Sequence, residues 1–192
     1  MANNRDNYVN AIGEIVIKFN MLERFLLAGI FMASNIDKKL CTELFGSEDF
    51  LVKLKTFDVV VRHKITDTTL LIEFGKLISK LDNLNTNRNK YLHSYWHFDK
   101  TNLTTEISKY TRKSIGTLPH LYKEPVDMYL LKVFDGNITF GLIELDMFIV
   151  DNFMKNKKTK NMSDNLKKLL PKFKKAYYEE IKKKQPKTNK QP

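Results

Sequence analysis

The sequence is poor in the residues that build several common kinds of site. It has one cysteine, Cys41, which excludes an internal disulfide and a cysteine-rich zinc site and is typical of a reducing compartment. Its longest apolar run, residues 25–33, is far shorter than the about 20 residues that cross a bilayer. Its 7 glycines form no phosphate-binding loop. We therefore expect a cytoplasmic protein with no cofactor and no membrane partner.

The length and composition are those of an ordinary folded domain. The 192 residues are 42% hydrophobic and 29% charged, which is enough apolar surface for one core. We predict a helical domain over residues 1–156, which includes a long connection at 99–137. A basic amphipathic helix at 157–184 is expected to pack on this domain, and residues 185–192 are expected to be disordered.

The positive charge is confined to one end of the chain. Residues 1–154 carry 19 basic and 19 acidic side chains, so the whole net charge of +11 falls on residues 155–192. Such a segment can bind polyanions by releasing their counterions, but it can equally be a solubilising end. If it binds RNA, the run Lys182, Lys183 and Lys184 is the expected contact.

Apolar residues recur at the three- and four-residue steps of amphipathic helices, which predicts an all-α fold. The first row predicts a long helix from Tyr8 to Ile30, interrupted by the carboxylate of Glu23. A short helix to Phe45 follows, with Ser47 as the expected N-cap of the next one. The second long row is Leu70, Phe74, Leu77, Leu81, Leu84, Arg88, Tyr91 and Tyr95, in which Arg88 is the one residue unsuited to a core.

The helical period fails between Asp99 and Phe134, where we expect extended structure or a small β-hairpin. The triplet Asp135-Gly136-Asn137 is typical of a turn, so the last core helix is predicted to start at Ile138. A further helix from Ser163 to Lys184 carries an apolar row of Leu166, Leu169, Leu170, Phe173, Tyr177 and Ile181.

The densest run of chemically capable side chains is residues 87–96. On a continuous helix Asn89, His93 and Trp96 would stack at i, i+4 and i+7, with Arg88 one step round the cylinder. Self-cleavage of RNA through its 2′-hydroxyl needs a base, an acid and a donor for the charge on phosphorus. Histidine serves either proton role, and a guanidinium matches phosphate oxygens. Since one histidine is few for two roles, the chemistry favours a site shared by a homodimer.

The motif Arg88-Asn89-x-x-x-His93 resembles the R-x4-6-H signature of the HEPN domains, and Tyr95 resembles the last position of the R-x4-H-x-Y form found in HEPN toxins. The resemblance covers about ten residues and their setting on a long helix. It implies an up-and-down helical bundle, a dimer with facing motifs, and metal-independent endoribonuclease activity. It also implies a role in toxin–antitoxin or antiviral systems, with an antitoxin or regulatory protein as a further partner.

Other interpretations of the same residues stay open. Arg88 could be a structural arginine that pairs with Glu23. If Arg88 is catalytic instead, Glu23 would be a supporting residue that does not touch the substrate. Tyr95 and Trp96 are more often core or interface aromatics than catalytic groups. His93 and His97 form an H-x-x-x-H pair, but a third metal ligand is not evident, so we expect no metal site. The alternative function is a catalytically inactive helical module that binds RNA or a protein.

Overall fold

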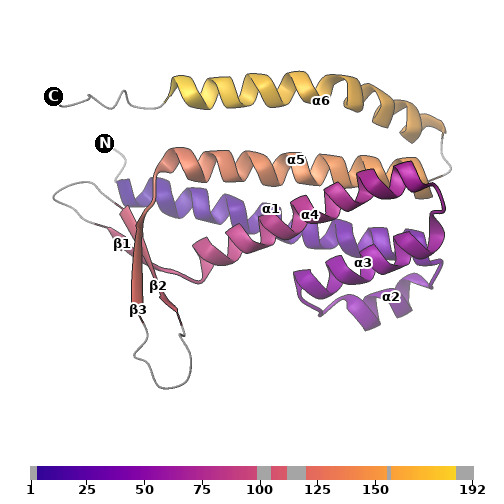
Figure 1. Ribbon diagram of the computed structural model, residues 1–192, viewed down its shortest axis with the longest axis horizontal. Helices are drawn as coiled ribbons and strands as arrows, with labels where there is room; N and C mark the ends of the chain where they lie inside the picture. The colour runs from indigo at the N-terminus through magenta and orange to yellow at the C-terminus, as the bar shows by residue number, and fades with distance from the viewer. Residues whose placement is uncertain (1–3, 99–104, 112–119, 155–156, 185–192) are drawn as a thin grey trace.

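The computed structural model describes residues 4–98, 105–111, 120–154 and 157–184. Figure 1 shows long helices packed side by side, with a small sheet at one end of the bundle. The elements in chain order are α1 (Asn4–Ser34), α2 (Lys38–Phe45), α3 (Phe50–Lys64), α4 (Thr68–Leu92), β1 (Tyr95–Phe98), β2 (Thr105–Thr111), β3 (His120–Pro125), α5 (Met128–Phe153) and α6 (Lys157–Lys183). This confirms the predicted all-α class with a small β insertion. The expected tail at 185–192 lies outside the described residues.

Helices α2, α3, α4 and α5 begin at aspartate caps. The carboxylates of Asp37, Asp49, Asp67 and Asp127 each accept a backbone N–H from the first turn of the following helix. Ser47 was the predicted cap of α3, and this was wrong by two residues because Asp49 takes that role and accepts from Val52 N at 2.9 Å. Among the described helices, none is both long enough and apolar enough to span a membrane.

The main core lies between α1, α3, α4 and α5. Its centre is aromatic: Phe57 meets Phe74 edge-on at 5.6 Å, and Phe74 stacks on Phe148 at 4.8 Å between ring centres. Phe19, Leu22, Leu26 and Ile30 of α1 are almost fully buried against this cluster. These are residues of the predicted apolar rows, so the helical periodicity alone identified the buried faces.

The predicted turn at residues 135–137 is wrong, because these residues lie inside α5. Asp135 forms an ion pair of 2.6 Å with Lys18 of α1, and Asn137 accepts a hydrogen bond of 2.7 Å from the Tyr178 hydroxyl of α6. Gly136 lies against the ring of Tyr177, where a Cβ atom would be 2.2 Å from Cε1. Each residue of the triplet therefore serves helix packing, and the connection expected at 99–137 is shorter since α5 begins at Met128.

The helix predicted to run through Tyr95 is also too long, since α4 ends at Leu92 and the chain turns into β1. The strands form an antiparallel sheet in the order β1-β2-β3, with Trp96 opposite Ile107 and Ile107 opposite Glu124. Ile107 is buried, and Trp96 packs beside Tyr8 and Tyr91. The helical spacing of Tyr91 and Tyr95 is thus coincidental, because β1 satisfies its backbone by pairing with β2.

Helix α6 packs along α5 through a second, smaller apolar cluster. Phe140 and Met147 of α5 and Leu170 of α6 form its buried centre, with Tyr177 and Tyr178 at its edge. The predicted apolar row divides: Leu166, Leu170, Tyr177 and Ile181 turn inward, whereas Leu169 and Phe173 are 43% and 55% exposed. Glu144 of α5 binds Lys80 of α4 and Lys174 of α6, and so joins three helices.

Candidate active site

The sequence motif lies at the C-terminal end of α4, next to the sheet. The backbone N–H of His93 donates to Asn89 O at 3.1 Å and closes the last turn, which makes His93 the C-cap. Its imidazole is exposed. An exposed histidine at the end of a helix is accessible to a ligand.

Arg88 is partly buried and has no carboxylate partner among the described residues. Its Nη1 donates to Asn89 Oδ1 at 3.0 Å, and its Cζ lies 5.4 Å from the ring centre of Phe19. Its Nε is buried without a hydrogen-bond acceptor. Leaving such a donor unpaired costs about 1–3 kcal/mol. The neutral amide of Asn89 and the ring of Phe19 therefore hold a guanidinium whose charge the described fold leaves uncompensated.

Glu23 lies one helical turn from Phe19 on α1, but its ion pair is with Lys53 at 3.4 Å. Lys53 of α3 is only 4% exposed and also donates to the backbone oxygen of Glu48. A pairing of Glu23 with Arg88 was one interpretation of the sequence, and the observed ion pair goes to the lysine instead. Neither the contact of Arg88 with Phe19 nor the ion pair of Glu23 with Lys53 was predicted, since no local sequence pattern marks a contact between helices.

The predicted stack of Asn89, His93 and Trp96 on one helix face is wrong because Trp96 belongs to β1. The indole Nε1 of Trp96 donates to Tyr91 O at 2.9 Å, and its ring lies 6.1 Å from that of Tyr8. Tyr91 itself is only 7% exposed. Tyr95 is on the opposite face of β1 and is 64% exposed. Trp96 of β1 therefore packs on Tyr91 of the motif helix within the same chain.

The second histidine of the motif region, His97, lies on β1, where its Nε2 is 2.7 Å from Ser108 Oγ of β2. Because α4 ends before β1, His93 and His97 do not share the helix face that a two-histidine metal site would need. In the part of the chain that the structure describes, no group of three histidine, cysteine, aspartate or glutamate side chains could hold a metal ion.

The lysines predicted to contact RNA are at the far end of α6. Lys182 and Lys183 are exposed, whereas Lys184 forms an ion pair of 2.5 Å with Glu180. This hydrogen bond lowers the pKa of Glu180 below its ordinary value. Figure 1 shows that α4 and α6 both end on the side of the bundle that carries the sheet. The motif and the distal lysines thus share one end of the molecule, on different helices.

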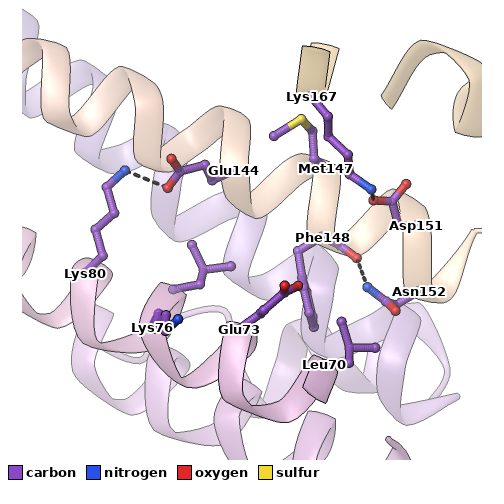
Figure 2. A pocket seen from close by; sticks show the side chains of 11 residues that line it. Leu70, Glu73, Lys76, Lys80, Glu144, Met147, Phe148, Asp151, Asn152 and Lys167 are labelled. Atoms are coloured by element: carbon purple, nitrogen blue, oxygen red, sulfur yellow. Dashed lines mark hydrogen bonds and ion pairs between the residues drawn. The ribbon is translucent and has the colours of Figure 1, made fainter. Parts of the chain in front are cut away.

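Figure 2 shows a groove of about 480 Å³ where α4, α5 and the start of α6 meet. Its floor is apolar, with Leu70, Leu77, Met147 and Phe148. Its rim holds three carboxylates and three lysines, and four of these six side chains form ion pairs with one another. Burial raises the pKa of Glu144, but hydrogen bonds from Lys174 and Lys80 outweigh it and hold that pKa below its ordinary value. Asp151 binds Lys167. This groove therefore has little free charge of either sign.

Comparison of the chain with protein-family models, with curated proteins and with solved structures gives no match. The functional interpretation therefore depends on the motif residues and their geometry.

Proposed function

We propose that the protein is a metal-independent endoribonuclease of the HEPN type, acting as a toxin or an antiviral-defence effector in the cytoplasm. The observation that supports this most is that an uncompensated guanidinium, Arg88, and an exposed imidazole, His93, both lie at the C-terminal end of α4. Asn89 orients Arg88 through their 3.0 Å hydrogen bond. The proposal covers an RNA substrate, a homodimer and a regulatory protein such as an antitoxin.

In the proposed reaction the 2′-hydroxyl of a ribose attacks the adjacent phosphorus while the bond from phosphorus to the 5′-oxygen breaks. One imidazole takes the proton of the 2′-hydroxyl, and a second returns a proton to the 5′-oxygen that leaves. The two His93 side chains of a dimer would supply these roles, and Arg88 would stabilise the charge that builds on the phosphate oxygens. The products are a 2′,3′-cyclic phosphate and a 5′-hydroxyl.

The decisive experiment is incubation of the purified protein with labelled RNA in EDTA, followed by identification of the product ends. We expect cleavage to persist in EDTA and to fall about 100-fold or more in His93→Ala, because general acid–base catalysis is worth about 10²–10⁴ in rate. His63→Ala is the matched control, since His63 is an exposed histidine on α3 away from the motif. Arg88→Lys and Arg88→Ala should also lose activity, and circular dichroism checks that they fold.

The alternative is a catalytically inactive module that binds RNA or a protein. It is favoured by the presence of one histidine, His93, in the R-x4-H motif of each chain and by the exposed Lys182 and Lys183. The same experiment separates the two functions. RNA that stays intact with the wild-type protein, but binds to it, supports the module. Cleavage that disappears in EDTA and returns with a divalent ion contradicts the proposed mechanism.

A further inference from the structure

A second groove, of about 790 Å³, follows the exposed side of α4 from the end of α3 to α5. Its apolar floor includes Ile72, Leu84 and Phe134. Its polar lining consists of Arg62, Lys76, Ser79, Lys80, Asn83, Asn87 and Asn137. On α4 these residues recur every three or four positions, so they form one continuous row along the helix.

The charged residues that line this groove are all cations. Arg62 pairs with Asp58 at 2.8 Å and Lys80 with Glu144 at 2.6 Å, and both carboxylates lie outside the lining. Lys76 is exposed and forms no ion pair with the described residues. Exposed ion pairs such as that of Arg62 are worth little and can be exchanged for a phosphate. The groove of Figure 2, with carboxylates on its rim, lacks this bias of sign.

An exposed row of α4 leads from the groove, whose lining on α4 ends at Asn87, to His93. Ser79, which lines it, is followed at seven-residue intervals by Thr86 and His93, and all three are exposed. On an α-helix such residues lie almost in line, drifting by about 20° per step. From Gly75 to Asn87 the groove follows α4 for about 18 Å at about 1.5 Å per residue. The lining of cations and amides therefore ends one residue before Arg88, and the exposed row of Ser79, Thr86 and His93 connects it to the candidate active site.

We infer that this groove binds the sugar-phosphate backbone of single-stranded RNA and directs the strand to His93. This rests on the proposed function and adds to it how the substrate is held. The length of the groove corresponds to about five stacked nucleotides at about 3.4 Å each. Lys76 and Arg62 contact phosphates, and the amides of Asn83 and Asn87 donate to phosphate or ribose oxygens. Contacts to the backbone alone make the binding tolerant of sequence.

The test measures binding of a fluorescent, unstructured 20-nucleotide RNA by anisotropy over a range of salt, in a His93→Ala background so that the RNA stays intact. Lys76→Gln with Arg62→Gln should weaken binding roughly threefold to tenfold and lower the salt slope by about 1.4, because each phosphate contact to a single strand contributes about 0.7. Lys76→Gln alone should lower the slope by about half as much. Lys55→Gln, an exposed lysine of α3 outside the groove, is the matched control.

Cleavage kinetics give a second readout, with His93 intact. The groove variants should lower kcat/KM for the 20-nucleotide RNA and leave cleavage of a dinucleotide unchanged, because a dinucleotide reaches only Arg88 and His93. Asp82→Asn should strengthen binding, since Asp82 is an exposed carboxylate four residues before Thr86 on the same side of α4. Equal affinity and slope in the groove variants and Lys55→Gln would overturn the inference, as would equal losses on both substrates. A wild-type protein that never cleaves RNA refutes the proposed function instead, while the binding measurements still decide the groove.

Discussion

Replacing Gly136 by alanine tests how closely α6 packs on α5. The added Cβ atom would be 2.2 Å from Cε1 and 2.8 Å from Cζ of Tyr177, whereas carbon atoms in contact stay about 3.5–4.0 Å apart. The ring cannot retreat freely, because its hydroxyl donates to Lys132 O at 2.9 Å and its face meets Phe140 edge-on at 5.6 Å. Overpacking of this kind costs about 1–3 kcal/mol.

The same substitution also brings a gain, since alanine is favoured over glycine inside a helix by about 1 kcal/mol. Gly136→Ala should therefore lower the free energy of unfolding by up to about 2 kcal/mol. Gly13→Ala is the control, because Gly13 lies inside α1 with no atom within 4 Å of an added Cβ. It receives the gain alone and should stabilise the protein by about 1 kcal/mol.

Urea unfolding followed by circular dichroism measures both variants, and thermal unfolding should shift by about 2–4 °C per kcal/mol for a chain of this size. In a Tyr177→Ala background the steric conflict is gone, so Gly136→Ala should change sign and become stabilising. Equal stabilisation by Gly13→Ala and Gly136→Ala in the otherwise unchanged protein would refute the close packing of Tyr177 on α5.

Three further predictions concern charge and assembly. Glu144→Gln should destabilise the protein most at neutral pH. The pKa of Glu144 is lowered in the folded protein, so the stability that its carboxylate contributes is full above the unfolded pKa of about 4.3 and is lost as the pH falls through the folded pKa. An equal loss of stability at every pH in urea unfolding would contradict this. Charge reversal of Lys182, Lys183 and Lys184 should reduce the salt dependence of RNA binding, and an unchanged slope would make them a solubilising end. Tyr91 and Trp96 pack in the main core and Tyr95 is 64% exposed, so Tyr95 is the aromatic side chain of this region that the proposed homodimer would cover, and Tyr95→Glu should shift sedimentation toward monomer. A wild-type protein that is monomeric and fully active would exclude the shared site.

The fold was predictable where the signal is local. The apolar rows of α1 and α4 repeat every three or four residues, and the buried positions Phe19, Leu22, Phe74 and Leu81 follow from them. The errors arose where a distant segment decides the structure. Residue 136 is a glycine within α5 rather than in a turn, because the ring of Tyr177 occupies the space that a side chain at this position would fill.

The same distinction applies to the candidate site. Arg88 and Asn89 are neighbours in sequence, so their hydrogen bond was within reach of sequence reasoning. Two contacts near the site join different helices: that of Arg88 with Phe19 and the ion pair of Glu23 with Lys53. The periodicity of the sequence carries no information on such pairs. The end of α4 was predicted wrongly because Tyr91 and Tyr95 continue the helical spacing into a strand whose partner, β2, follows later in the chain.

Helix α6 is attached to the bundle differently from the other long helices. Its apolar contacts belong to the small cluster around Phe140, Met147 and Leu170, while the main core is complete among the other helices. Segments with few buried contacts open more readily than the whole protein unfolds. Amide hydrogens of α6 should therefore exchange faster than those of α1 or α5, and matched exchange in all three would mean one cooperative unit. Such opening would break the ion pairs of Lys167 and Lys174 with α5 and extend the reach of the lysines of α6, while Arg88 stays on α4.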